Sequence, residues 1–334
     1  MKVLVTGGAG FIGSNFIHYI LKEHPQWEVT NLDKLTYAGN LDNLRDAETE
    51  PRYHFIKGDI ADRELVDGLL RHGYDAIINF AAESHVDRSI LDTSPFIETN
   101  IKGTQVLLEG ARQYHIERFI QVSTDEVYGS IENGSFSELS PLSPNSPYAA
   151  SKAAADLLSH AYFQTYHVPV IITRSSNNFG PYQFLEKLIP LAITNALEDK
   201  PIPVYGDGLN IRDWIFVVDH CRALDIIIQK GEDGQIYNIA GGSEKTNLEL
   251  VYQLLGLLNK PKSLITFVSD RPGHDRRYAL NITKIMERLD WKPEYSFDKA
   301  LSVTVDWYLG HKPWWLRIKS GEYAKYYDRI YLHR

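Results

Sequence analysis

Cysteine is almost absent from this sequence of 334 residues, in which Cys221 is the only one. A single thiol cannot form an intramolecular disulfide framework, and it cannot supply a cysteine-rich zinc site. The histidines also lack the spacing, with a second ligand close by, that a metal site requires, so we expect no bound metal. The chemistry of the protein must therefore come from other residue types.

Long hydrophobic runs and an excess of positive charge are absent as well. No uncharged stretch reaches about 18 residues, so no membrane span is expected, and the apolar segment 3–5 is too short for the core of a signal peptide. We therefore expect a soluble cytoplasmic protein. The 35 lysines and arginines are outnumbered by 43 acidic residues, for a net charge of -8, which argues against non-specific binding of DNA or RNA.

Short apolar runs alternate with amphipathic stretches over the first half of the chain, and the hydrophobic share of 43% suffices for a sizeable core. This alternation predicts an α/β fold with a doubly wound parallel sheet of the Rossmann type. The predicted strands are apolar on both faces, as a sheet covered by helices on both sides requires. The predicted strands are residues 2–6, 28–32, 53–57, 76–80, 118–123 and 170–174, and the predicted helices are 11–24, 64–72, 96–114 and 147–166.

The pattern changes after Arg174. We predict a first domain over residues 1–176, which binds a dinucleotide and regains a strand near 236–240, and a second, smaller mixed α/β lobe over 177–334. The second lobe is expected to close over the carboxyl ends of the strands, where such sheets bind ligands. Within it we predict loops at 175–183 and 271–277 and helices at 185–197, 248–258 and 297–309.

A glycine-rich turn follows the first predicted strand and opens the first helix. The spacing of Gly7, Gly10 and Gly13 allows backbone amides to approach a pyrophosphate at the helix N-terminus. Asp33 ends the second strand, where its carboxylate can accept hydrogen bonds from ribose hydroxyls and would repel a 2′-phosphate. The alternative is a structural glycine turn, but it does not explain the acid, so we predict NAD as the cofactor.

Two further strand ends are candidates for the same cofactor site. Asp59 and Ile60, at the end of the third strand, could hold the adenine. Phe80, Ala81 and Ala82, at the end of the fourth, would let the cofactor lie close to the backbone. The alternative for each is an ordinary residue at a strand end.

Tyr148 and Lys152 lie at the start of an alanine-rich predicted helix, with Ser146 as the expected N-cap and Pro147 at the first helical position. Residues four apart share a helix face. A lysine ammonium beside a phenol stabilises the phenolate and lowers the tyrosine pKa. Tyr148 could then accept a hydroxyl proton while hydride leaves the same carbon for nicotinamide.

The same spacing occurs elsewhere and is not specific by itself. Tyr53 and Lys57 lie in a predicted strand, where four residues span about 13 Å and cannot pair in this way. Two later pairs are expected to be surface features: Tyr295 with Lys299, and Tyr308 with Lys312.

The fifth predicted strand ends in Thr124, Asp125 and Glu126. Together with the glycine turn, Asp33 and the tyrosine–lysine pair, Thr124 resembles the extended short-chain dehydrogenase/reductase superfamily. The complete Thr-Asp-Glu triplet resembles that of the dTDP-glucose 4,6-dehydratases, and the similarity extends over essentially the whole chain. This resemblance implies the dehydration of dTDP-glucose to dTDP-4-keto-6-deoxyglucose: oxidation at C4, loss of water across C5 and C6, and return of hydride to C6 through tightly bound NAD⁺.

Such an elimination needs a base at C5 and an acid at the C6 hydroxyl, and adjacent carboxyl groups in different environments can divide these roles. The resemblance implies that Asp125 is the acid, that Glu126 is the base, and that Thr124 contacts the C4 hydroxyl beside Tyr148. A solvated Asp-Glu pair at a strand end is the alternative.

Guanidinium groups suit a diphosphate, and Arg212 and Arg271 are the candidates, although an arginine considered alone is more often a surface residue. The resemblance favours both and implies further contacts. Around the cofactor these are Phe11, Ile12, Lys34, Thr36, Thr99 and Asn178. Around the nucleotide sugar they are Ser84, Asn177, Lys187, Leu188, Pro203, Tyr205 (which can stack on thymine), Asn247, His274 and Tyr278.

Three residues depart from the family pattern: Ser175 stands where cysteine is expected, Phe179 where tyrosine is usual, and Leu185 where proline is usual. They leave open the fine preference for sugar or nucleotide. The resemblance also implies a homodimer in which helices 96–114 and 147–166 pack as a four-helix bundle.

Two other functions remain as alternatives. A nucleotide-sugar 4-epimerase or decarboxylase on the same scaffold would need Tyr148 and Lys152, but would not explain the adjacent acids. A non-catalytic NAD-binding module would be expected to lack the tyrosine–lysine pair or the acids, and this sequence has both pairs.

Overall fold

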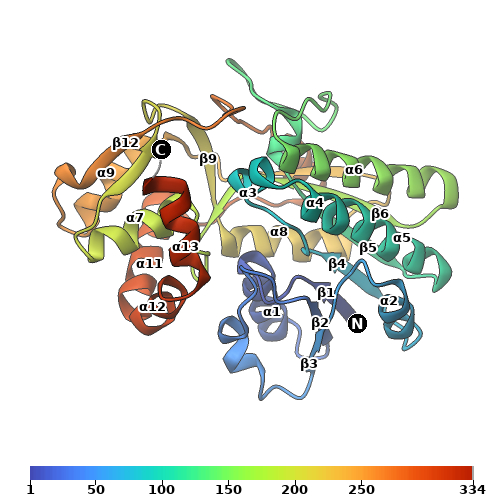
Figure 1. The fold of residues 1–334 in the computed structure, drawn as a ribbon. Helices are drawn as coiled ribbons and strands as arrows, with labels where there is room; N and C mark the ends of the chain where they lie inside the picture. The colour runs from blue at the N-terminus through green and yellow to red at the C-terminus, as the bar shows by residue number, and fades with distance from the viewer. Residues whose placement is uncertain (333–334) are drawn as a thin grey trace.

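A seven-stranded, entirely parallel sheet forms the centre of the larger lobe in the computed structural model, which describes residues 1–332 (Figure 1). The strand order is β10-β6-β5-β4-β1-β2-β3, so the chain reverses direction across the sheet between β1 and β4. The strand predictions are confirmed, including the late return of β10. The strands are β1 (Lys2–Thr6), β2 (Glu28–Asp33), β3 (Tyr53–Lys57), β4 (Ala76–Asn79), β5 (Arg118–Thr124), β6 (Val170–Ser175) and β10 (Ile236–Ile239).

Helices cover both faces of this sheet because successive strand residues point to opposite sides. Val3 and Val5 face the core shared with α1 and α8, whereas Leu4 faces the core shared with α2 and α5. Figure 1 shows α5 and α6 running side by side over the second face, where they are in contact. The helices are α1 (Phe11–Glu23), α2 (Arg63–Leu70), α5 (Thr104–Gln113), α6 (Pro147–Tyr166) and α8 (Val217–Lys230).

The predicted helix at 96–114 is less regular than expected. It begins with α4 (Ser94–Phe96), continues as the π-helical segment η2 (Ile97–Gly103) and becomes α-helical only in α5. The buried side chain of Asn100, inside the π-helical segment, accepts from the Glu83 amide at 2.9 Å and donates to the Ser151 hydroxyl at 2.8 Å. A π-helical turn often marks a functional site, and Thr99 in this segment borders the cavity described below.

The second lobe packs helices around two small sheets. Its helices are α7 (Leu188–Leu197), α9 (Asn247–Leu257), α11 (Phe297–Gly310), α12 (Lys312–Lys319) and α13 (Glu322–Tyr327), and its strands are β7 (Asn177–Phe179), β8 (Ile202–Tyr205), β9 (Ile211–Phe216), β11 (Glu244–Thr246) and β12 (Ile265–Val268). The remaining elements are α3 (Val86–Leu91), α10 (Thr283–Leu289), η1 (Leu41–Ala47), η3 (Asp125–Tyr128), η4 (Lys262–Leu264) and η5 (Asp328–Leu332). Residues 333 and 334, at the end of the predicted second lobe, lie outside the described residues.

Two local predictions are wrong. Residues 175–183 are not all loop, because β7 pairs in parallel with β9 more than thirty residues later, a partner that no local pattern reveals. The helix predicted at 185–197 begins only at Leu188.

Tyr308 is also not the surface residue that was predicted. Its side chain is fully buried among the helices of the second lobe, and its hydroxyl donates to the Gln183 carbonyl at 2.6 Å. Lys312, its partner by spacing, is exposed in α12. Tertiary packing of the last helices, which the spacing of two residues cannot encode, separates the pair.

No helix within residues 1–332 combines the length and the apolar character that a membrane crossing demands.

Candidate active site

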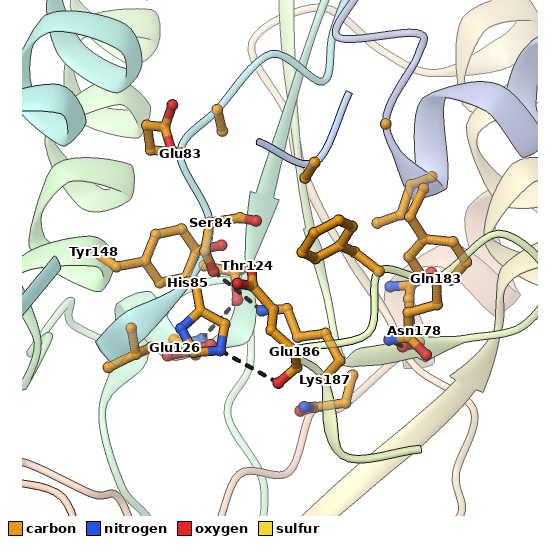
Figure 2. Close-up of a pocket in the computed structure, with 18 of the residues that line it drawn as sticks. Glu83, Ser84, His85, Thr124, Glu126, Tyr148, Asn178, Gln183, Glu186 and Lys187 are labelled. Carbon is orange, nitrogen blue, oxygen red and sulfur yellow. Dashed lines mark hydrogen bonds between the residues drawn. The ribbon is translucent and has the colours of Figure 1, made fainter. Parts of the chain in front are cut away.

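A cavity of about 380 Å³ opens at the carboxyl ends of the strands and takes its walls from both lobes. All the residues predicted above for catalysis, cofactor binding and substrate binding line this cavity. Figure 2 shows Tyr148, Thr124 and Glu126 on one side of it, with Asn178 and Gln183 on the other. The structure therefore brings the predicted residues together from segments that are far apart in the sequence.

The glycine turn is packed so closely that side chains are excluded. Gly7 has a φ of +69°, and a Cβ added there would lie 2.6 Å from the Ala81 backbone nitrogen. A Cβ at Gly13 would lie 2.5 Å from the Gly7 carbonyl oxygen. The turn thus leaves its backbone open to the cavity at the start of α1, which is the arrangement a pyrophosphate requires.

Asp33 ends β2 beside this turn and is 8% exposed. Its carboxylate accepts from the Ala9 amide at 2.9 Å and from the Leu35 amide at 2.7 Å. Burial raises the pKa of Asp33, and the two amide hydrogen bonds oppose that rise. Each carboxylate oxygen retains a second lone pair, so the carboxylate can accept hydrogen bonds from the two hydroxyls of an adenosine ribose.

Tyr148 and Lys152 are both buried on the cavity side of α6. The Ser146 side chain accepts from the Ala149 amide at 3.1 Å and Pro147 opens the helix, so the predicted N-terminus is confirmed. The Lys152 ammonium donates to the Val122 carbonyl at 2.7 Å. Burial lowers the pKa of Lys152 to about 8, opposed by the Asp156 carboxylate.

The pKa of Tyr148 is not lowered as expected. Burial raises the pKa of Tyr148, the Glu126 charge adds to the rise, and only a hydrogen bond with Thr124 lowers it. Lysine was expected to lower this pKa, but removal of the phenolate from water outweighs such an effect in the polypeptide alone.

Asp125 and Glu126 are adjacent in sequence but lie in different environments. Asp125 is 2% exposed, and one of its carboxyl oxygens, Oδ2, has no hydrogen-bond partner among the described residues. Burial raises the pKa of Asp125 well above its usual range, and the neighbouring Glu126 raises it further. Glu126 is only partly buried. The two neighbouring carboxyls therefore differ in burial, and such a difference in environment is what lets two carboxyls serve as acid and base.

The two candidate arginines are not surface residues. Arg212 is 5% exposed, donates to the Asp275 carbonyl at 2.9 Å, and lies 4.3 Å from the ring centre of Tyr278. The Arg271 side chain is 16% exposed, and its Nε has no hydrogen-bond partner among residues 1–332. Both guanidinium groups line the cavity, as a diphosphate site requires.

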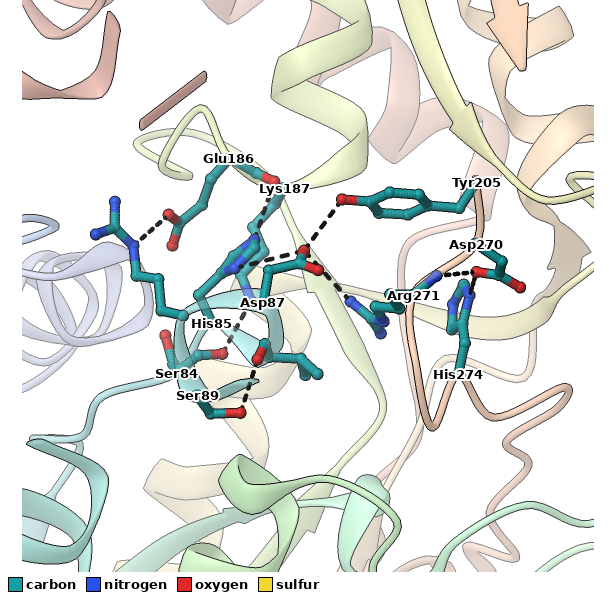
Figure 3. A network of polar contacts seen from close by, with 12 residues as sticks. Ser84, His85, Asp87, Ser89, Glu186, Lys187, Tyr205, Asp270, Arg271 and His274 are labelled. Atoms are coloured by element: carbon teal, nitrogen blue, oxygen red, sulfur yellow. Dashed lines mark hydrogen bonds and ion pairs between the residues drawn. The ribbon is translucent and has the colours of Figure 1, made fainter. Parts of the chain in front are cut away.

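A polar network that the sequence did not reveal lies at the wall of the cavity around Tyr205 and Arg271 (Figure 3). The Tyr205 hydroxyl donates to the Asp87 carboxylate at 3.2 Å, and Arg271 lies 3.9 Å from the same carboxylate. His85 lies 3.8 Å from Asp87, and burial lowers its pKa well below the usual range. Asp87 and His85 follow the end of the fourth strand, a position that could have marked them as site residues, but their partners come from the second lobe.

Only one of the three departures from the family pattern borders the cavity. Ser175 lines it and accepts a hydrogen bond from the Asn178 side chain at 3.2 Å. Phe179 and Leu185 are buried in the core of the second lobe.

The parallel sheet, its glycine turn and the buried tyrosine–lysine pair place the protein in the class of extended short-chain dehydrogenases/reductases. Within that class, the chain belongs to the GDP-mannose 4,6-dehydratase family, whose model matches residues 4–304. A dTDP-glucose 4,6-dehydratase of Actinoplanes sp. is 52% identical, over 94% of this chain and 100% of that relative. The resemblance noted from the sequence is confirmed.

Solved structures agree with this membership. A dTDP-glucose 4,6-dehydratase of Streptomyces venezuelae, solved with NAD and TYD bound, is 51% identical with a TM-score of 0.94, over 96% of this chain and 100% of that one. A UDP-glucuronic acid 4-epimerase of Bacillus cereus is 30% identical with a TM-score of 0.88, over 93% of this chain and 99% of that one. Since the two enzymes share one fold, the fold does not distinguish dehydratase from epimerase, and the site residues must do so.

Proposed function

We propose that this chain dehydrates dTDP-glucose to dTDP-4-keto-6-deoxyglucose with a tightly bound NAD⁺ that each turnover regenerates. The observation that carries the proposal is the pair Asp125 and Glu126, two adjacent carboxyls with different burial at the end of β5. They border the same cavity as Tyr148 and Lys152. The named activity of relatives about half identical in sequence supports it.

In this proposal the cofactor lies along residues 1–176, and β10 adds the last strand to the sheet of this domain. The nucleotide sugar lies mainly against residues 177–334. The glycine turn would hold the pyrophosphate, Asp33 the ribose, Asp59 and Ile60 the adenine, and Asn178 the nicotinamide end. When bound, NAD⁺ supplies the acceptor for the C4 hydride and returns that hydride at C6.

Side chains of the protein accept and donate the protons of the reaction. Tyr148 takes the proton of the C4 hydroxyl, with Thr124 as its hydrogen-bonding neighbour and the Lys152 ammonium stabilising the phenolate. The C4 ketone makes the C5 hydrogen acidic, and Glu126 removes it. Asp125 protonates the C6 hydroxyl, which leaves as water. Glu126 returns its proton to C5 as hydride arrives at C6, and the proton on Tyr148 balances the one that Asp125 gave up.

The test is to incubate the purified protein with dTDP-glucose, without a reducing cofactor, and to record the mass of the nucleotide sugar. Loss of one water with no net NADH is expected. An unchanged mass with conversion to the galactose epimer would contradict the proposal and favour a 4-epimerase. Turnover of UDP-sugars alone would overturn the choice of nucleotide.

We also propose a cytoplasmic homodimer in which the helices of 96–114 and 147–166 form a four-helix bundle. Large apolar side chains on these helices support it: Ile97 is 55% exposed, Leu157 61% and Tyr166 51%. A partner subunit packed on these helices would cover exposed apolar side chains of this kind. The one thiol, that of Cys221, is buried, which suits a reducing compartment.

A further inference from the structure

Arg88, in α3, joins three parts of the chain that are distant in sequence. Its guanidinium carbon lies 3.7 Å from the ring centre of Tyr37 and 4.0 Å from that of Tyr326, and its Nε donates to the Glu186 carboxylate at 3.0 Å. Glu186 is 4% exposed. Arginine suits this position better than lysine, because a planar guanidinium can stack on both aromatic rings and donate to a buried carboxylate at its edge.

Tyr37 belongs to the segment 34–40, which follows β2 and borders the cofactor side of the cavity through Lys34, Thr36 and Gly39. The ends of this segment are tied down: the Leu35 amide donates to Asp33 at 2.7 Å, and the Asn40 amide donates to the Ala9 carbonyl at 3.0 Å. Between these ties, the Tyr37 ring packs edge-on against Phe184, 5.6 Å between centres, and over Arg88.

The other contacts of Arg88 belong to the second lobe. Glu186 directly precedes Lys187 and Leu188, which border the substrate side of the cavity. Tyr326 lies in α13, and its hydroxyl is hydrogen-bonded to the His85 ring at 3.0 Å. Through Arg88 the segment 34–40 is thus held against a substrate-side segment and against the C-terminal helix.

We propose that Arg88 is a positioning residue that clamps the segment 34–40 to the second lobe and so slows the release of NAD. The inference rests on the cofactor of the proposed function. A cofactor regenerated in every turnover has no need to leave, so a clamp that touches neither the reacting carbons nor the catalytic pairs suits this chemistry. The clamp consists of Arg88, Tyr37, Tyr326 and Glu186.

The test compares Arg88→Met with Arg52→Met in the full chain. Arg52 is a matched control: its side chain is 24% exposed, as is that of Arg88, and it pairs with Glu50 at the same distance of 3.0 Å, but it precedes β3 and does not border the cavity. Each protein is loaded with labelled NAD and chased with excess unlabelled NAD. We expect dissociation to be about tenfold faster in Arg88→Met, since two cation–π contacts and an ion pair are lost, and unchanged in Arg52→Met.

Thermal unfolding of the same variants separates the clamp from a general loss of stability. A similar loss of Tm in both, with faster NAD release in Arg88→Met alone, supports the clamp. Equal NAD release from Arg88→Met and the unmodified protein overturns it. If Arg88→Met does not fold, Tyr37→Leu, which removes the ring beside Arg88, should show the faster release, and Tyr37→Phe, which keeps the ring and loses only the hydrogen bond with Glu186, should show a smaller increase. An unmodified protein that binds no NAD would overturn the proposed function itself, whereas retained NAD with no effect of these variants overturns only the clamp.

Discussion

At the scale of single residues, two neighbours in sequence differ in burial. The Asp125 carboxyl, at the start of η3, is almost completely buried, and burial followed by the charge of Glu126 raises its pKa. Glu126, next to it, is only partly buried. Elimination needs an acid and a base at neighbouring positions, and desolvation favours the protonated form of the more deeply buried Asp125.

Asp125→Asn should therefore block elimination without blocking oxidation at C4. We expect kcat to fall by about 10²- to 10⁴-fold, which is the usual contribution of a general acid. Reduced cofactor should build up on the protein when dTDP-glucose is added, which its absorbance reports. Glu126→Gln is the matched variant, since it removes the base and leaves the acid. Full activity of Asp125→Asn would show that another group protonates the C6 hydroxyl.

Lys152→Met should abolish activity and raise the free energy of unfolding. The lysine is charged up to pH 10.5 in the unfolded chain but only to about 8 in the native protein, a difference equivalent to about 3 kcal/mol. Between these pH values the unfolded chain binds a proton that the native protein does not, so the free energy of unfolding rises with pH. Below pH 8 Lys152 is charged in both states, and its burial then lowers the free energy of unfolding by the full amount.

We therefore expect Lys152→Met to be inactive yet more stable by up to about 3 kcal/mol at pH 7, with a smaller gain at pH 10. Urea unfolding at both pH values, at equal NAD occupancy, measures this. A gain that is the same at both pH values would mean that packing, and not the buried charge, is responsible.

At the scale of elements, the N-terminus of α6 determines where Tyr148, the proposed catalytic tyrosine, lies. Ser146 caps the helix, and Tyr148 follows in the first turn, which is the part of a helix most easily frayed. The residues Tyr148, Lys152 and Asp156 then recur every four positions and are all buried. Asp156 pairs with Arg174 of β6 at 2.9 Å, which ties this face of the helix to the sheet.

Removal of the cap by Ser146→Ala should lower the free energy of unfolding by about 1 kcal/mol. It should also lower kcat, because the first turn carries Tyr148. Ser146→Asp keeps a side-chain acceptor and should retain most of the stability. Denaturant unfolding and initial rates of both variants test this, and equal stability of Ser146→Ala and the unmodified protein would refute the role of the cap.

At the scale of the whole molecule, η2 and α6 leave apolar side chains on the outside of the fold: Ile97 of η2 and Leu157 and Tyr166 of α6 are exposed. Leu157 of α6 offers the clearest test of the proposed dimer. Leu157→Glu should give a monomer by light scattering, because two carboxylates would meet across the two-fold axis. Leu139→Glu changes a leucine that is 95% exposed in a loop outside these helices and should leave a dimer. A dimeric Leu157→Glu protein would place the interface elsewhere.

Local patterns in the sequence were sufficient to predict the strands and the main helices of the larger lobe. The glycine turn, the caps of α6 and the strands that are apolar on both faces depend on neighbours in the chain or on a period of two or four residues. For the same reason the candidate catalytic and cofactor residues at the ends of these strands could be selected. The substrate contacts came from the family resemblance instead, because no period marks a loop residue such as Asn247.

The sequence by itself determined the sheet, the glycine turn and the two candidate catalytic pairs, since propensity and periodicity act over a few residues. Only the tertiary structure decided how β7 pairs with β9, that Tyr308 is buried, that burial raises rather than lowers the pKa of Tyr148, and that Arg88 joins Tyr37 to Tyr326. Each of these depends on partners far apart in the chain and on the exclusion of water that their packing creates. A local stretch of sequence encodes neither the distant partners nor the exclusion of water.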